Sequence, residues 1–356
     1  MAGRRSRPLG RRPIAIRLMW LRFSSSIDPR NILGMNIQSV GEESGMESAE
    51  GYRLVTRSDF DGLVCAVLLK ELGLISEVKF VHPKDMQDGL IEINDRDITT
   101  NLPYVEGVFL AFDHHFSETV RVGHKENHII DPQAPSAARV VYDYYGGKSS
   151  FSRVPTDLLE AVDKADSAHF TKEEVLHPEG WTLLNFILDA RTGLGRFKSF
   201  RISNYQLMMD TIDAMRDLSI AQILDLPDVK ERSDLYFEHA VQFKDQMLRC
   251  TVVHGNVLVV DLRQEKVVYA GNRFVNYALF PETNVSIQVI WGFKNQNTVL
   301  TVGKSIFNRS SSSNIGELMM RYGGGGHAGA GTCQIPNEDA DKVLAEVVEA
   351  LQEKDD

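Results

Sequence analysis

The sequence GVFLAFDHH, residues 107–115, decides the fold expected for this chain. Residues 107–112 have the apolar run of a central strand in a parallel sheet, and Asp113, His114 and His115 follow directly. An acid and two imidazoles at the end of a buried strand are hard to explain by packing, because desolvated charge is costly unless it is paired or metal-bound. We therefore expect a functional site here; a solvated surface turn is the alternative.

Strands alternate with helices around this stretch, which predicts an α/β fold with a parallel sheet whose ligands bind beyond the carboxyl ends of the strands. Further strands are expected at 52–56, 78–82 and 127–130, with helices at 63–72, 136–145 and 155–165.

Residues 197–249 have an almost wholly helical pattern, and beyond Cys250 the period changes to a mixture of β-like and helical segments. The chain should therefore consist of a parallel-sheet domain joined by a helical connector to a smaller, mixed α/β domain. The boundaries expected are 1–50 for an N-terminal extension, 51–196 for the first domain, 197–249 for the connector and 250–356 for the second domain.

The charge is spread unevenly over the 356 residues. The chain has 39 basic and 49 acidic residues, a net charge of −10, and residues 1–27 contain seven arginines and no acid, so the remainder carries −17. Because the chain outside residues 1–27 is strongly acidic, we do not expect a long groove that binds nucleic acid. A polyanionic substrate would need a local cationic pocket or metal ions. No apolar run approaches the roughly 18 residues of a membrane span, so no membrane partner is expected.

The arginine-rich segment before residue 27 has the composition of a mitochondrial transit peptide. A disordered tail, or sequence upstream of a true start at Met35 or Met46, is the alternative that we favour. We expect a cytoplasmic protein, with the mitochondrial matrix as the alternative. The three widely spaced cysteines also indicate a reducing compartment.

A pair of carboxylates, Asp59 and Asp61, lies in the sequence SDFDG at residues 58–62. Both can point into one crevice if the turn between strand and helix is tight, as Gly62 permits, and such oxygen ligands suit a hard divalent cation. A loop that caps the next helix is the alternative, and for this cluster taken alone it is the favoured interpretation.

Another acidic cluster, Asp163 and Asp166 with Ser167 and His169, lies at the end of the helix expected at 155–165. Because the helix dipole is negative there, Asp166 makes sense if a cation compensates its charge. An exposed acidic helix end is the alternative.

A glycine-rich run, GGGGHAGAG, occupies residues 323–331. Six glycines in nine positions could let several backbone N–H groups converge on an anion, with His327 as a further donor. A flexible linker is the alternative, which the closely flanking strand and helix patterns disfavour. Positive charge nearby in the sequence comes from Lys304, Arg309 and Arg321.

The order of these four motifs resembles the DHH phosphoesterase superfamily from about residue 52 to the C-terminus. That superfamily includes exopolyphosphatases, manganese-dependent pyrophosphatases, RecJ-type exonucleases and oligoribonucleases. The resemblance, strongest to the exopolyphosphatase-like and oligoribonuclease-like branch, implies two divalent cations, usually Mn²⁺ with Mg²⁺ or Co²⁺ as alternatives, and attack of an activated water on phosphorus. It implies metal ligands at Asp59, Asp61, His114 and Asp166, catalytic roles for Asp113, His115, Arg309 and His327, and substrate contacts at Ser305, Arg309, Gly324, Gly325, Gly326 and His327.

Two positions depart from the pattern of the superfamily. Val55 stands where many relatives have a metal-binding histidine, and Asn101 stands where a bridging carboxylate belongs. Asp97 or Asp95 could replace that carboxylate only if the strand register differed. We therefore expect one tight and one loose metal site.

The expected function is release of a terminal phosphate or mononucleotide from polyphosphate, a short oligonucleotide or a nucleoside bisphosphate. A nucleotide-binding or regulatory protein that has lost catalytic power is the alternative. The partners expected are such small or oligomeric phosphate compounds, and a homodimer is one option for the assembly.

Overall fold

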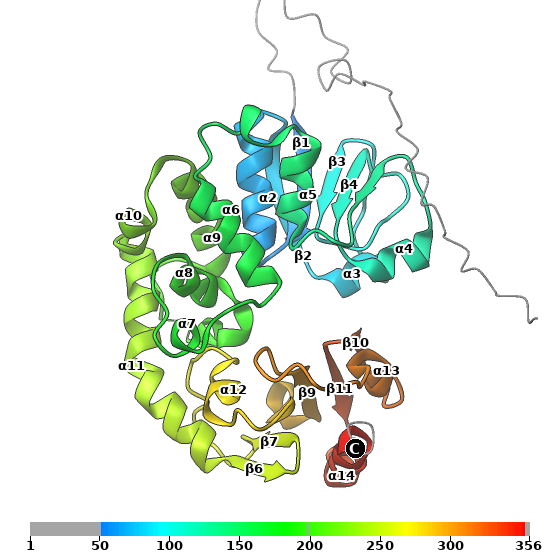
Figure 1. Ribbon diagram of the computed structural model, residues 1–356, viewed down its shortest axis with the longest axis vertical. Helices are drawn as coiled ribbons and strands as arrows, with labels where there is room; N and C mark the ends of the chain where they lie inside the picture. Colours follow the sequence, from blue (N-terminus) through cyan, green and yellow to red (C-terminus); the bar gives the residue numbers. More distant parts are fainter. Residues whose placement is uncertain (1–50, 198, 353–356) are drawn as a thin grey trace, which may run out of the picture. The chain divides into compact units, whose positions relative to one another are not determined.

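The computed structural model describes residues 51–197 and 199–352, so the N-terminal extension expected at 1–50 lies outside the described residues (Figure 1). The first part of the chain contains β1 (Tyr52–Arg57), α2 (Phe60–Glu71), β2 (Ile75–Val81), α3 (Pro83–Gln87), β3 (Asp97–Thr100), β4 (Leu110–Asp113), α4 (Phe116–Val122), β5 (His128–Ile130), α5 (Ala137–Tyr144), α6 (Thr156–Asp166), α7 (Lys172–Leu176) and α8 (Gly180–Leu188).

Strands β1 to β5 form one sheet in the order β2-β1-β3-β4-β5, with every neighbouring pair parallel. The direction of the strand order reverses between β1 and β3, and ligands of such sheets bind beyond the carboxyl ends of the strands at this switch point. The predicted parallel sheet is therefore confirmed, and the segments that follow β1, β3 and β4 meet at one edge.

Helix α2 is central to the packing of this domain. Asp59 is its N-cap and accepts a hydrogen bond from the Gly62 backbone N–H at 3.0 Å. Ten of its twelve residues are buried, which is typical of a helix covered on all sides. It packs against α5, α6 and α9 (Asn204–Asp217) (Figure 1). The first turn of α2 needs glycine at position 62, because a Cβ there would lie 2.0 Å from the Arg57 carbonyl oxygen.

The segment expected to be helical contains α9, α10 (Ile220–Leu224) and the long α11 (Pro227–Arg249). Pro227 is the first residue of α11, where its missing N–H costs nothing. The helical prediction is confirmed, and the exact boundaries of the connector stay a prediction.

The second sheet is mixed and has the order β10-β11-β9-β8-β7-β6, with only the β7–β8 pair parallel. The two-domain α/β layout is therefore confirmed. In the described part of the chain, no helix is both long and apolar enough to cross a membrane. The elements of this domain are β6 (Thr251–His254), β7 (Val257–Asp261), α12 (Val275–Leu279), β8 (Val285–Trp291), β9 (Thr298–Lys304), α13 (Ile315–Met320), β10 (Gly325–His327), β11 (Ala330–Ile335) and α14 (Ala340–Gln352).

The glycine-rich run forms the hairpin β10–β11, in which residues 325–327 pair with 330–332. A Cβ on Gly326 would lie 2.2 Å from the Ala330 carbonyl oxygen, and one on Gly324 would lie 2.1 Å from that of Thr332. Gly324 and Gly326 are therefore needed for close approach of two backbones. The convergence of N–H groups from this run on an anion stays a prediction.

Candidate active site

Three predicted metal ligands, Asp61, His114 and Asp166, come together at the carboxyl edge of the parallel sheet. They offer one ligand atom each, all within 4.8 Å of one another. His114 Nε2 lies 3.1 Å from Asp166 Oδ2, and this buried nitrogen has no hydrogen-bond partner among the described residues. His114 Nδ1 is 3.3 Å from the Ala134 carbonyl oxygen, which can only accept, so Nδ1 carries a proton and Nε2 is the nitrogen that faces the carboxylates and could bind a metal once deprotonated. These residues fit a divalent cation.

The charges around this cluster need compensation. Asp61 is 2% exposed and accepts hydrogen bonds from the backbone N–H groups of Ala137 and Ala138, at the start of α5, at 2.9 and 2.8 Å. Burial, followed by the charge of Asp166, nevertheless raises the pKa of Asp61 to about 8. Burial lowers the pKa of His114, but Asp166 and Asp61 outweigh it and raise that pKa to about 9. Bound protons or a bound cation would relieve this excess of negative charge.

Asp113 orients His115. The buried Asp113 accepts hydrogen bonds through Oδ1 from His115 Nδ1 at 2.7 Å and from the His114 backbone N–H at 2.8 Å. Burial lowers the pKa of His115, but its hydrogen bond to Asp113 outweighs this and leaves the pKa above the ordinary value. His115 is 39% exposed, so its ring can reach a ligand while Asp113 fixes its orientation.

Asp59 stands apart from the other three predicted ligands, because protein groups already surround its carboxylate. Arg57 Nε lies 2.9 Å from Asp59 Oδ2, and Asn101 Nδ2 donates to Asp59 Oδ1 at 3.3 Å. Val55 is fully buried and packs with Val81 and other apolar residues. A cation beside Asp59 would have to displace the Arg57 guanidinium, so this position is the weaker one for a metal.

The register of β3 decides between Asn101 and Asp97. Asp97 begins the strand and forms hydrogen bonds of 2.7 and 2.9 Å with Arg53, whereas Asn101 follows the carboxyl end. The alternative in which Asp97, or Asp95 before it, supplies a bridging carboxylate is therefore wrong. Asp163 also lies outside the cluster: it pairs with Arg139 and accepts from Ser136 Oγ at 2.7 Å.

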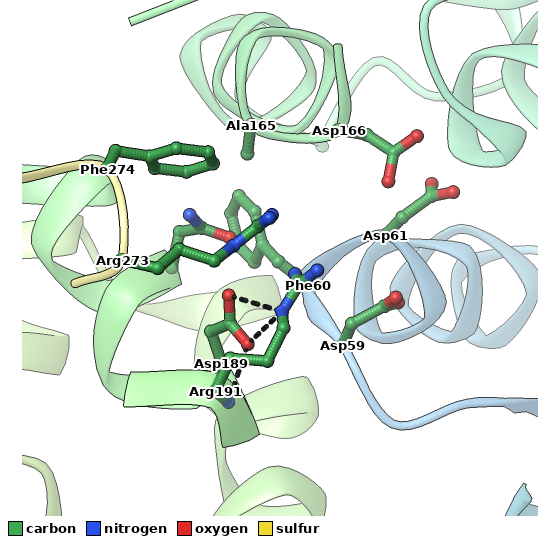
Figure 2. Close-up of a pocket in the computed structure, with 10 residues that line it drawn as sticks. Asp59, Phe60, Asp61, Ala165, Asp166, Asp189, Arg191, Arg273 and Phe274 are labelled. Atoms are coloured by element: carbon green, nitrogen blue, oxygen red, sulfur yellow. Dashed lines mark hydrogen bonds and ion pairs between the residues drawn. The ribbon is translucent and has the colours of Figure 1, made fainter. Parts of the chain in front are cut away.

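A small pocket adjoins the cluster, with a volume of about 40 Å³. Figure 2 shows the arginine side chains extending toward the side on which Asp59, Asp61 and Asp166 lie. Arg191 pairs with Asp189, with Nε 2.8 Å from Oδ1. The residues that line the pocket are Asp59, Phe60, Asp61, Ala165, Asp166, Asn185, Asp189, Arg191, Arg273 and Phe274. Sequence reasoning missed Arg191 and Arg273, because each is a single arginine in an ordinary sequence context.

The predicted residues of the second domain have different surroundings. Arg309 Nη2 donates to the Ala168 carbonyl oxygen at 3.1 Å, just beyond α6 and two residues after Asp166. Ser305 is 3% exposed, and its Oγ accepts from the N–H groups of residues 307 and 308 at 3.2 and 3.1 Å. Its hydroxyl therefore supports a turn, and contact with substrate stays a prediction for it, as for Arg309 and the glycines 324–326.

His327 belongs to the electrostatic surroundings of the cluster. Its Nδ1 accepts from the Gly329 backbone N–H at 3.1 Å, so Nε2 carries the proton of the neutral ring and can donate. Desolvation, followed by the charges of His115 and Arg57, lowers the pKa of His327. His327 should therefore be neutral at neutral pH.

Comparisons with known proteins identify the family of this chain. No family model matches the sequence. The search of the curated proteins also finds no match. Among solved structures, the pGpG-specific phosphodiesterase PggH of Vibrio cholerae is 58% identical, with a TM-score of 0.74, over 85% of this chain and 99% of that chain.

Two distant structures have TM-scores too low to support an argument. RecJ of Thermus thermophilus in complex with Mg²⁺ is 13% identical (TM-score 0.45; 85% of this chain and 50% of that chain). CDC45 of Entamoeba histolytica is 9% identical (TM-score 0.44; 85% and 95%). At 58% identity over nearly all of PggH, and with Asp61, His114 and Asp166 from three of the four motifs assembled at the carboxyl edge of the parallel sheet, the chain belongs to the DHH phosphoesterase superfamily.

Proposed function

We propose that this chain is a metal-dependent phosphodiesterase that hydrolyses a short linear dinucleotide, with pGpG as the first candidate. The observation that carries the proposal is the Asp61–His114–Asp166 cluster in a chain 58% identical to a pGpG-specific phosphodiesterase. A small pocket beside the cluster, rather than a long basic groove, fits a short substrate.

Asp61, His114 and Asp166 would hold the cation, and their mixture of carboxylate and imidazole donors suits Mn²⁺, with Mg²⁺ and Co²⁺ as alternatives. When bound, the ion would lower the pKa of water in the site toward about 7 and thereby supply a nucleophile at neutral pH. The Ala134 carbonyl oxygen keeps His114 in the tautomer that this role requires.

His115 is the group placed to handle the proton of the leaving oxygen. Water attacks phosphorus, the bond from phosphorus to the 3′-oxygen breaks, and His115 gives that oxygen a proton; the proton lost by the water goes to solvent. Asp113, at 2.7 Å from His115 Nδ1, aligns the ring and raises the fraction that is protonated. Each cleavage of pGpG would yield two molecules of GMP.

A catalytically weakened nucleotide-binding protein is the second candidate. Val55 and the Arg57–Asp59 ion pair favour it, since together they weaken the position beside Asp59. The intact cluster around His114 disfavours it, because no packing role explains a buried imidazole nitrogen that faces two carboxylates.

A substrate panel tests the proposal. Protein loaded with Mn²⁺, Mg²⁺ or Co²⁺ is incubated with pGpG, pApA, a longer oligoguanylate, polyphosphate and adenosine 3′,5′-bisphosphate, and the products are separated by chromatography. We expect GMP from pGpG, and none when Asp61→Asn protein is used. Hydrolysis of polyphosphate or the bisphosphate without any dinucleotide cleavage would contradict the proposal, and binding without turnover would favour the second candidate.

A further inference from the structure

Arg273, in the segment before α12, has an unusual environment for a partly buried cation. Its Nε is buried and has no hydrogen-bond partner, and among the residues that the structure describes none forms an ion pair with its guanidinium. Its guanidinium lies over the face of the Phe274 ring, whose centroid is 4.3 Å from Cζ. Figure 2 shows the Arg273 side chain extending into the pocket.

Arg232 shows how this protein ordinarily treats a buried arginine. It is 1% exposed, and its guanidinium donates to the carbonyl oxygens of Asp228 and Ile202 at 2.9 and 2.7 Å. Asn204 Oδ1 accepts a further, longer bond of 3.3 Å from it. Buried polar groups are nearly always satisfied in this way, so the unpaired Nε of Arg273 requires an explanation.

The surroundings of Arg273 leave its positive charge uncompensated. Asp189, the carboxylate whose charge acts on Arg273, is already paired with Arg191, with Nε 2.8 Å from Oδ1. Burial, followed by the charge of Arg191, lowers the pKa of Arg273 to about 10, so the group is still protonated at neutral pH. The pocket therefore has a cationic wall of two arginines opposite an acidic wall that would hold the metal.

We propose that Arg273 is a substrate-binding residue whose guanidinium receives a phosphate group held between it and the Asp61–His114–Asp166 cluster. The inference rests on the proposed function and adds the residue that positions the phosphate. A planar guanidinium binds two phosphate oxygens at once, and the bond supplies the missing partner of Nε. The pocket, at about 40 Å³, is far below the roughly 300–1,000 Å³ of pockets that enclose a whole ligand, so it admits the phosphate and leaves the nucleosides outside.

Calorimetric titration of Mn²⁺-loaded protein with inorganic phosphate and with GMP tests the proposal. Arg273→Met should weaken both by about 10- to 100-fold, the loss expected for hydrogen bonds to a charged group. Arg273→Lys keeps the charge but not the bidentate geometry, so its affinity for phosphate and GMP should lie between those of the wild type and Arg273→Met. Because Arg273→Met removes a positive charge near the candidate metal ligands, its affinity for Mn²⁺ should equal or exceed that of the wild type. Loss of Mn²⁺ binding in Arg273→Met would make the phosphate effect indirect and overturn the inference.

Thermal unfolding of the ligand-free variants separates binding from a structural role, with Arg232→Met as the matched control. Arg232→Met should lower the Tm because it leaves several acceptors unpaired, whereas Arg273→Met should leave the Tm equal or higher. An equal loss of Tm in Arg232→Met and Arg273→Met would overturn the inference. It would also be overturned if Arg273→Met kept the phosphate affinity and the KM of the wild type. If phosphate binding depends on Arg273 but no dinucleotide is cleaved, the proposed function fails and this inference stands.

Discussion

The guanidinium of Arg57 forms an ion pair with the carboxylate of Asp59, with Nε 2.9 Å from Oδ2. Asn101 donates to the other oxygen of the same carboxylate at 3.3 Å. The charge of Arg57 thus balances that of Asp59, and the Asn101 amide and the Gly62 N–H add hydrogen bonds to the same carboxylate. The site therefore has one group of three candidate metal ligands, Asp61, His114 and Asp166, and one carboxylate that protein groups already occupy.

The number of tightly bound ions should follow from this difference. Titration of stripped wild-type protein with Mn²⁺ should give one tight site, because a second ion has to displace Arg57. In the double variant Arg57→Met with Asn101→Asp, two carboxylates face each other without a cation, so a second site should tighten and Mn²⁺ should raise the Tm more than in wild type. Two equally tight sites in the wild type would refute the interpretation.

Asp166 and Asp163 form a matched pair on α6. Asp166→Asn should weaken Mn²⁺ binding by about 100-fold or more, since the charge of one ligand is lost. Asp163→Asn should leave Mn²⁺ affinity nearly unchanged and reduce the free energy of unfolding by about 1–3 kcal/mol, because Arg139 loses a charged partner. Calorimetry and denaturant unfolding measure the two effects. Equal losses of Mn²⁺ affinity would contradict the assignment.

Metal affinity should rise with pH. His114, with a pKa of about 9, and Asp61, with a pKa of about 8, both carry protons at pH 7 in metal-free protein. A cation must displace these protons, so binding is weakest in acid and strengthens until the pH passes about 9. Calorimetry in buffers of different ionisation enthalpy should detect proton release on Mn²⁺ binding at pH 7. Constant affinity between pH 6 and pH 8, without proton release, would contradict this prediction.

His115 should affect turnover far more than metal binding. His115→Ala should lower kcat by about 10²- to 10⁴-fold, the range for loss of a positioned proton donor, with Mn²⁺ affinity nearly unchanged. Because Asp113 raises the pKa of His115, wild-type activity should decline only when the pH exceeds the ordinary histidine value. A variant that loses Mn²⁺ in proportion to its activity would show that His115 supports the metal instead.

The hairpin β10–β11 should tolerate a methyl group at Gly325 but not at Gly326. Gly326 has φ +154, and its Cβ would meet the Ala330 carbonyl oxygen, whereas a Cβ on Gly325 has no atom within 4 Å. Gly326→Ala should therefore lower the free energy of unfolding by about 1–3 kcal/mol and Gly325→Ala by much less. Denaturant unfolding checks this. The kcat and KM of Gly325→Ala then test its predicted substrate contact without a change in fold.

The parallel sheet and the cluster around His114 could be predicted from sequence because their signals are local. An apolar run followed by Asp113, His114 and His115 identifies both a central strand and its functional end. The cap at Ser136 and the helix after it were also predictable, since capping depends on neighbouring residues.

Other features depend on contacts between distant segments, and no local pattern indicates them. Strands β10 and β11 were missed because their glycines resemble a loop until a partner strand is present. The pairing of Arg57 with Asp59 and the placement of Arg273 beside residues 59–61 depend on side-chain directions and on loops that meet only after folding.

The three candidate metal ligands lie within residues 61–166, whereas the proposed phosphate receptor, Arg273, follows the long α11. On these proposals, the groups that bind the metal and the group that holds the phosphate are encoded in separate stretches of the gene. Mutations after residue 250 could then change the affinity for substrate while the metal ligands stay intact. A lineage with this architecture could tune how tightly it holds a substrate without rebuilding its metal site.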